Sequence, residues 1–239
     1  MVIKKKIINW LRKQLKDSGR NGFVVGLSGG LDSSVSAFLC KLAAGTKVLG
    51  LILPCHSQRQ DLDDARFLAK KIRIKTKEVN VSKIYDALIR VLPSANKLAK
   101  SNLKPRLRML VLYYFANKMN YLVCGTSNKV ELMTGYFTKH GDGASDIIPL
   151  GDLLKGQVVN LARELGIPRR IIDRLPTAGL WPGQTDEAEM GISYSELDDI
   201  LSRLENKKKQ VISREKVSKV NRIIKGSEHK RQGPGICYV

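Results

Sequence analysis

The residue types best suited to chemistry in this chain lie in the run SGGLDSS, from Ser28 to Ser34. Two consecutive glycines let backbone N–H groups approach an anion without a Cβ in the way, and the start of a helix adds unpaired donors and a positive dipole end. The pattern is therefore typical of a phosphate-binding loop. Asp32 would repel a phosphate unless a cation lay between them, so we interpret it as a Mg²⁺ ligand on a polyphosphate. The alternative is that Ser28 and Asp32 only cap the helix.

A strand and a helix are expected to hold this loop from its two sides. The run FVVGLS, from Phe23 to Ser28, is apolar and β-branched, which is typical of a strand buried on both faces of a parallel sheet. After Leu31, apolar residues recur at helical spacing as far as Gly45, which favours a helix C-cap there. Because strand, loop and helix occur together, we favour nucleotide binding over simple capping.

The same alternation of strand and helix continues through the first half of the chain. A long helix is expected over 105–119, and further strands over Lys47–Pro54, from Lys77, and over Asn120–Thr126. This order predicts an α/β fold with a doubly wound, Rossmann-like parallel sheet and helices on both faces. Ligands of such sheets bind beyond the carboxyl ends of the strands, where SGGLDSS and GTSNK both fall. After Asp152 the pattern is mainly helical.

Length and composition limit the class of protein. With 239 residues, of which 43% are hydrophobic, the chain can bury one substantial core, so we expect a single domain over 1–239. Its apolar runs are too short to cross a bilayer. The basic N-terminal segment carries a helical stripe, which predicts a packed helix of a cytoplasmic protein and not a signal peptide. This stripe consists of Ile3, Ile7, Leu11 and Leu15.

Metal and disulfide chemistry of the Cys and His kind is not expected. The chain has 4 Cys and 3 His, all far apart, with no CxxC pair. We expect the cysteines to be reduced packing residues. They are Cys40, Cys55, Cys124 and Cys237.

The charge is strongly positive. Lys and Arg number 42 against 22 Asp and Glu, for a net charge of +20, which could serve nucleic acid, an anionic small substrate or solubility alone. Aromatic residues make up only 6% and are not interleaved with the lysines, so the stacking surface of a single-strand binder is not evident. Nucleic-acid binding is therefore not expected as the main role.

The glycine loop is not a Walker A motif, because it lacks the lysine that such a motif directs at the β and γ phosphates. SGGLDSS instead resembles the pyrophosphate-binding loop (PP-loop) of the ATP pyrophosphatase superfamily, whose fold is of the adenine nucleotide alpha hydrolase type. The resemblance implies that the β and γ phosphates leave together and that AMP is transferred to the substrate. It gives the reaction type but not the substrate.

The second half of the chain carries a more specific resemblance. The segment Gly125 to Val158 is too polar and too rich in glycine to be ordinary core, so we expect an active-site surface. Together with PTAGLWPGQTDEAEMGISYSELD, it closely resembles ammonia-dependent NAD synthetases, and the likeness runs from the phosphate loop to HKRQGP near the C-terminus. The resemblance implies a homodimeric ligase that amidates deamido-NAD with ATP, Mg²⁺ and ammonia through an acyl adenylate.

Roles for individual residues follow from this resemblance. It implies that Asp32 and Glu131 bind Mg²⁺ and that both are catalytic together with Lys155. The implied ATP-binding residues are Gly26, Leu27, Ser28, Gly29, Gly30, Leu31, Asp32, Ser33, Thr126, Lys155 and Thr177. The implied deamido-NAD-binding residues are Arg106, Lys139, Asp146, His229 and Lys230.

Each role has a simpler alternative. Lys139 and Lys155 could be solvated surface lysines. Glu131 could be an ordinary acid on a helix surface, Arg106 could belong to a structural ion pair, and His229 could simply be exposed.

Two other functions remain open at this point. A superfamily enzyme that acts on tRNA would suit the positive charge, although it would leave YFTKHGD and LWPGQTDE without a purpose. A module that binds ATP without catalysis would not need both acids. No glutamine-hydrolysing portion is recognisable, so free ammonia is the expected nitrogen donor unless a separate subunit delivers it. The apolar helix over 107–119 could be a dimer interface or internal core.

Overall fold

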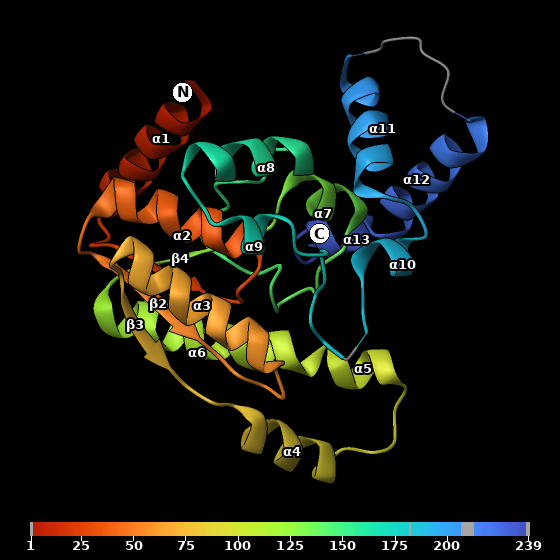
Figure 1. Cartoon of the computed structure of the whole chain (residues 1–239). Helices are drawn as coiled ribbons and strands as arrows, with labels where there is room; N and C mark the ends of the chain where they lie inside the picture. Colours follow the sequence, from red (N-terminus) through yellow and green to blue (C-terminus); the bar gives the residue numbers. More distant parts are fainter. Residues whose placement is uncertain (1, 182, 207–212, 238–239) are drawn as a thin grey trace.

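The computed structural model describes residues 2–181, 183–206 and 213–237. The described residues form a sheet of four parallel strands in the order β3-β2-β1-β4. The chain moves outward from β1 to β3 and then returns to the other side of β1, so the direction of winding reverses between β1 and β4. The predicted doubly wound parallel sheet is confirmed (Figure 1). The strands are β1 (Phe23–Gly26), β2 (Val48–Ile52), β3 (Lys75–Glu78) and β4 (Leu122–Cys124).

Along the central strands, alternate side chains point to opposite faces of the sheet and belong to two different hydrophobic cores. Phe23 and Val25 of β1 face α2 (Leu31–Ala44) and α3 (Arg59–Ile72). Val24 points the other way and belongs to a second cluster of buried residues, to which α6 (Leu103–Met119) contributes Met109. Because side chains along a strand alternate between faces, both faces of the sheet must be covered. The prediction of a fully buried strand from FVVGLS is confirmed, since Phe23, Val24 and Val25 are all buried.

A second layer of helices covers α2. Helix α1 (Val2–Ser18) packs on it through Ile7 and Leu11, which are buried as the N-terminal stripe predicted. Ile3 is 42% exposed, so the buried stripe begins at Ile7. Helix α8 (Lys155–Glu164) also packs on α2 and in turn contacts α9 (Arg169–Ile172).

A separate helical cluster lies on the side of the molecule opposite β3 (Figure 1). Its apolar centre includes Val130 of α7, Leu197 of α11 and Val220 of α12. The helices that build it are α7 (Lys129–Thr134), α10 (Asp186–Met190), α11 (Tyr194–Asn206) and α12 (Arg214–Gly226), and α13 (Glu228–Arg231) follows directly. Whether the sheet and this cluster form a single domain stays a prediction.

The third predicted strand is displaced. A strand was expected to run on from Lys77, but β3 ends at Glu78 and α4 (Ser82–Val91) begins a few residues later. The side chain of Asn80 accepts a hydrogen bond from the backbone N–H of Ser82 at 2.9 Å, which favours a turn there. A short helix, α5 (Lys97–Ser101), separates α4 from α6.

The apolar helix predicted as dimer interface or internal core is α6, and only one of its faces is core. Met109, Leu112 and Ala116 are buried against the sheet, whereas Leu110 is 70% and Tyr114 is 60% exposed. The helix is therefore core on one side and an apolar surface on the other.

All four cysteines are free thiols, as predicted, and Cys40, Cys55 and Cys124 are buried packing residues. The prediction of a packing role is wrong for Cys237, which is exposed. Burial raises the pKa of Cys55, which keeps that thiol protonated. Within the part of the chain that the structure describes, no helix has the length and apolar character needed to cross a membrane.

Candidate active site

The glycine loop lies between β1 and α2, where backbone geometry explains both glycines. Gly29 has φ +84°, and a Cβ there would lie 2.3 Å from the carbonyl oxygen of Asp61. Gly30 is the N-cap residue of α2 and offers no side chain to the first N–H groups of the helix. These donors are therefore suited to an anion from outside. The alternative in which Ser28 and Asp32 only cap the helix is wrong, because α2 has no side-chain cap hydrogen bond and the Asp32 carboxylate bonds to Asn128 and Lys155.

Those partners connect Asp32 to Glu131. The side chain of Asn128 donates from Nδ2 to Asp32 Oδ1 at 3.2 Å, and the backbone N–H of Asn128 donates to Glu131 Oε2 at 3.0 Å. Asn128 also caps α7, since its Oδ1 accepts from the Glu131 N–H at 3.1 Å. One residue thus holds both predicted metal ligands in the same small site.

The carboxylates of Asp32 and Glu131 repel each other when both are charged. Burial, and next the charge of Asp32, raise the pKa of Glu131 to about 8. Ionising both acids together is therefore costly without a neighbouring positive charge. Glu131 is not an ordinary surface acid of a helix.

Lys155 supplies a positive charge at the first turn of α8. Its Nζ lies 2.5 Å from Asp32 Oδ2, and its side chain is buried. Burial acts to lower the pKa of Lys155, but the carboxylates of Asp32 and Glu131 outweigh it, and the pKa is raised. The solvated-lysine alternative is wrong for this residue. Asp32, Glu131 and Lys155 come from three distant segments and meet at the reversal point between β1 and β4.

The two predicted threonines lie in loops beside this centre. Thr126 follows two residues after the end of β4, the strand that pairs with β1. Thr177 belongs to the same loop as Gly179. A Cβ on Gly179 would lie 3.9 Å from Asp61 Oδ2, and Asp61 is also the residue whose carbonyl lies against Gly29. The Thr177 hydroxyl now accepts from the Gly179 N–H at 3.1 Å. Both threonines are therefore near the glycine loop, with no ATP contact assigned by the geometry alone.

Four of the five residues predicted for deamido-NAD gather in a second group. Arg106 donates from Nε to the carbonyl of Lys139 at 3.3 Å, and Lys139 donates to the carbonyl of His229 at 2.6 Å. Lys230 donates to the carbonyls of Gly135 and Phe137 at 2.8 and 3.0 Å. The loop after α7 and the C-terminal segment are therefore joined. In this structure both ammonium groups bond to backbone carbonyls.

Asp146, the fifth residue, has a different position. It accepts from the backbone N–H of Val123 in β4 at 2.7 Å and from the Tyr113 hydroxyl at 3.2 Å. Tyr113 and Arg106 both line a cavity of about 860 Å³ on the outer side of α6. Asp146 is thus held at the edge of that cavity by the sheet.

Sequence reasoning missed two polar groups of the centre, Asn128 and Asp186. Asn128 could have been found from the pattern Asn-x-x-Glu, which is a capping signal, but its bond to Asp32 is not local. Asp186 of α10 is buried, and burial is the main cause of the rise in its pKa. It accepts a hydrogen bond from the Tyr194 hydroxyl at 3.0 Å.

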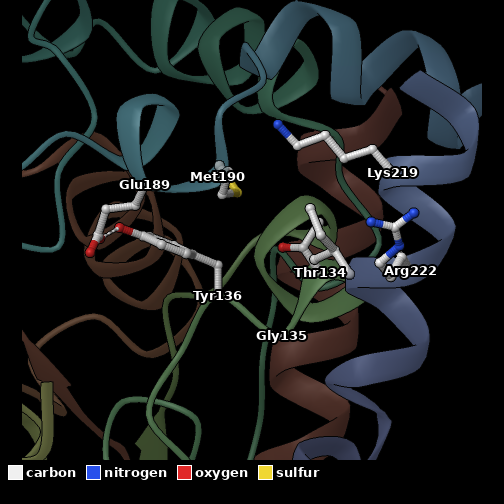
Figure 2. Close-up of a pocket in the computed structure, with 8 residues that line it drawn as sticks. Thr134, Gly135, Tyr136, Glu189, Met190, Lys219 and Arg222 are labelled. Carbon is white, nitrogen blue, oxygen red and sulfur yellow. Dashed lines mark hydrogen bonds between the residues drawn. The ribbon is translucent and has the colours of Figure 1, made fainter. Parts of the chain in front are cut away.

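A smaller cavity of about 400 Å³ lies behind α7, between α10 and α12. Figure 2 shows Tyr136 and Glu189 pointing toward each other across it, joined by a hydrogen bond that the Tyr136 hydroxyl donates. Gln184 donates to the same Glu189 carboxylate at 2.7 Å. The described residues that line this cavity include none of those predicted to bind ATP.

The chain is similar to known proteins of one family. The family model described as NAD synthase matches residues 3–234. A protein of Carboxydothermus hydrogenoformans, named NH(3)-dependent NAD(+) synthetase, is 46% identical over 236 residues, which cover 97% of this chain and 95% of the relative.

Two solved structures are similar over almost their whole length. An NMN synthetase from Francisella tularensis has a TM-score of 0.92 and 38% identity, and covers 99% of this chain and 98% of its own. An NH3-dependent NAD synthetase from Campylobacter jejuni has a TM-score of 0.87 and 29% identity, covering 99% and 97%. Because the family model matches from near the first residue to near the last, and full-length relatives share the fold, this chain belongs to the NAD synthase family.

Proposed function

We propose that this protein converts deamido-NAD to NAD, using ATP and ammonia and releasing AMP and pyrophosphate. The observation that carries the proposal is the meeting of Asp32, Glu131 and Lys155 beside the glycine turn, in a chain of the NAD synthase family. The name of the Carboxydothermus relative supports NAD as the product and ammonia as the nitrogen donor.

The reaction needs two displacements. A carboxylate is a poor electrophile, because attack by ammonia would have to expel an oxide. When a carboxylate oxygen of the nicotinate group attacks the α-phosphorus of ATP, a P–O bond forms and the bond to pyrophosphate breaks. The acyl adenylate then carries AMP as a good leaving group. Ammonia forms the C–N bond, the bond to AMP breaks, and a proton is released.

The first displacement brings two anions together, so positive charge must be present. Two unit charges 4 Å apart interact with about 4 kcal/mol near a protein surface, whereas a helix N-terminus supplies about 0.3–1 kcal/mol per charge. The N-terminus of α2 is therefore insufficient alone. Lys155, buried beside the glycine loop, is the residue suited to pair with a phosphate oxygen.

The donor set fits Mg²⁺ as the further source of charge. Asp32 and Glu131 offer the hard oxygen ligands that Mg²⁺ prefers, and among the described residues no cluster of three or more acidic, His or Cys side chains forms a complete metal cage. Two carboxylates completed by phosphate oxygens are the usual arrangement for this ion. When bound there, Mg²⁺ would neutralise phosphate charge during attack on the α-phosphorus.

The second group of residues is our candidate for the dinucleotide. We assign Arg106, Lys139, His229, Lys230 and Asp146 to deamido-NAD, which requires Lys139 and Lys230 to exchange backbone carbonyls for substrate oxygens. Closure of this group and of the loop bearing Thr177 would exclude water, which would otherwise hydrolyse the adenylate.

We further propose that the protein is a cytoplasmic homodimer and that nucleic acid is not its substrate. The exposed apolar face of α6, with Leu110 and Tyr114, supports self-association. Free ammonia is the proposed donor unless a separate subunit supplies it.

A second candidate function is amidation of nicotinate mononucleotide. It is favoured by the likeness to the Francisella NMN synthetase, whose TM-score of 0.92 exceeds the 0.87 of the Campylobacter NAD synthetase. The chemistry at the carboxylate would be the same. The two substrates differ only in the adenylate half that lies away from the reacting carbon.

One experiment decides between these functions. Purified protein is incubated with ATP, Mg²⁺ and ammonium, with either deamido-NAD or nicotinate mononucleotide, and products are identified by mass spectrometry. We expect NAD, AMP and pyrophosphate in equal amounts from the first mixture and much slower amidation in the second. A parallel tube replaces ammonium with glutamine and should give no amide. Absence of amide from both substrates would refute the proposal, and preference for the mononucleotide would replace it with the second candidate.

A further inference from the structure

Helix α11 contacts Lys155 at its backbone. Asp198 accepts from the Lys155 N–H through Oδ1 at 2.9 Å and from the Gly156 N–H through Oδ2 at 2.7 Å. Its carboxylate therefore satisfies two of the unpaired donors at the start of α8. A Cβ on Gly156 would lie 3.2 Å from Asp198 Oδ2, so the approach is close. The first turn of α8 is fixed by a side chain from another helix.

The same helix contacts Lys155 at its charged end. Tyr194 precedes Asp198 by one helical turn, so both side chains lie on one face of α11. The Lys155 Nζ lies 4.9 Å from the centre of the Tyr194 ring. Because Tyr194 and Lys155 are both buried, this cation–π contact is shielded from water and is stronger than an exposed one.

The Tyr194 ring is itself held in place. Its hydroxyl donates to Asp186 Oδ2 at 3.0 Å, and its backbone N–H donates to Glu187 at 2.8 Å. Helix α10, which carries both acids, is joined to the segment after α7 through the bond between Tyr136 and Glu189 (Figure 2). A series of hydrogen bonds therefore links the ring, through α10, to the segment that follows the helix bearing Glu131.

We infer that α11 is the element that positions Lys155, with Asp198 fixing its backbone and the Tyr194 ring fixing its ammonium group. The inference rests on the proposed function, because Lys155 must leave Asp32 when ATP binds. The Tyr194 ring then keeps the Lys155 ammonium group beside the phosphates, while the ammonium group exchanges the Asp32 carboxylate for a phosphate oxygen. Tyr194 and Asp198 are positioning residues and do not touch the substrate.

The test compares Tyr194→Leu, Tyr194→Phe and Asp198→Ala with two control variants. Phe67→Leu removes another cation–π contact, in which Arg170 of α9 lies 3.9 Å from the centre of the Phe67 ring on α3. Asp199→Asn changes the neighbouring exposed acid on α11. ATP affinity is measured by calorimetry, with Mg²⁺ and again with EDTA. The KM values for ATP and for deamido-NAD, kcat and the melting temperature are measured on the same samples.

We expect ATP affinity to fall about 10-fold in Tyr194→Leu, which matches the loss of a buried cation–π contact, and by a similar factor in Asp198→Ala. The KM for deamido-NAD should not change. Tyr194→Phe should melt at a lower temperature because it loses the bond to Asp186, yet keep ATP affinity within about 3-fold because it keeps the ring. The two control variants should bind ATP as the wild type does.

The inference is overturned if Tyr194→Leu binds ATP like the wild type, or if Tyr194→Phe loses as much affinity as Tyr194→Leu, since ring geometry would then be irrelevant. A wild-type protein that binds ATP but forms no amide would refute the proposed function and leave the affinity series to decide the role of α11. A wild-type protein that binds no ATP would overturn both.

Discussion

Asp32 and Glu131 must both change partners if they are to hold a cation. Asp32 is now bonded to Lys155 and Asn128, and Glu131 to the backbone of Asn128. Asp32→Asn and Glu131→Gln keep size and one acceptor oxygen while removing the charge. We expect each to lower the rate of pyrophosphate release about 100-fold or more. Mutation of a residue that only hydrogen-bonds a metal ligand already lowers metal affinity or activity about 10–100-fold, and loss of a ligand should cost more.

A pyrophosphate assay at ordinary Mg²⁺ concentration measures this effect, and circular dichroism and melting should show an unchanged fold. Asp152→Asn is a suitable control, because that acid is almost fully exposed and pairs with Lys129 at 2.9 Å. Near-normal turnover in either site variant would remove the metal assignment.

Gly29 offers a second prediction at the scale of single residues. An alanine there must adopt φ +84° and would place its Cβ 2.3 Å from the Asp61 carbonyl, so both strain and collision are expected. Gly19→Ala is a matched control, because Gly19 has φ +64° with nothing within 4 Å. We expect Gly19→Ala to lower the free energy of unfolding by about 1 kcal/mol and Gly29→Ala by clearly more.

Urea unfolding measures both values, and calorimetry should show that Gly29→Ala also loses ATP affinity. Equal destabilisation by the two variants would mean that the close approach to Asp61 does not constrain the loop.

Sequence reasoning could place residues that stand in a local pattern. Gly29 and Asp32 stand in one short motif, so their position at the junction of β1 and α2 was predictable from types and spacing, whereas their roles stay a prediction. Asn128 was missed because its bond joins it to Asp32 across 96 residues of chain, a relation that only the folded sheet creates. Lys139 and Lys230 were predicted as substrate ligands, but their present bonds to backbone carbonyls could not be foreseen from sequence.

At the scale of elements, helices α11 and α12 are joined by an exposed ion pair whose effect depends on pH. Lys216, and next the backbone N–H of Ser193, lower the pKa of Glu196 to about 2. A carboxyl whose folded pKa is lowered stabilises the protein above its unfolded pKa and loses that effect as pH falls through the folded value. This contribution should therefore be complete above about pH 4.5 and disappear toward pH 2.

Glu196→Gln tests the pair. We expect it to melt slightly below the wild type at pH 6, since exposed pairs contribute little, and the difference to vanish as pH approaches 2. Melting curves at intervals between these values measure it, and Glu215→Gln on α12 controls for the loss of one exposed acid. A constant difference across this range would show that Glu196 acts through packing alone.

Strands and helices with a strong period were predictable as elements, but their ends were not. FVVGLS gave a buried strand because both of its faces are covered by helices. The predicted position of β3 was wrong because all four of its residues are exposed. An exposed strand needs no apolar residues, so the sequence has no apolar pattern that marks where β3 begins and ends. The partnership between α11 and α8 was not predicted, because the Asp198 contact depends on how two helices meet.

At the scale of the whole molecule, the outer face of α6 makes a prediction about assembly. We expect light scattering to give twice the chain mass of 26.7 kDa for the wild type. Leu110→Glu places a charge in the middle of the exposed apolar face and should give the mass of one chain. Leu42→Glu, on the exposed side of α2, is the matched control and should stay dimeric. A wild type with the mass of a single chain would refute the homodimer.

The overall arrangement was predictable where topology dictates it. A doubly wound sheet brings the carboxyl ends of β1 and β4 together, so the helices that follow these strands, α2 with Asp32 and α7 with Glu131, had to begin close to each other. The helical cluster of α7 and α10 to α12 was not predicted as a unit. The apolar pattern of each segment predicts an amphipathic helix, but it does not predict which other helices that helix packs against.

The distribution of thiols makes the native chain ready for site-selective labelling. Because Cys40, Cys55 and Cys124 are enclosed and Cys237 faces solvent, a maleimide dye should attach once per chain, near the C-terminus. Gln232, a few residues earlier, accepts a hydrogen bond from Lys139 at 3.0 Å through its carbonyl. A fluorophore at Cys237 would therefore report when the C-terminal segment and the Lys139 loop separate or close, with no engineered cysteine.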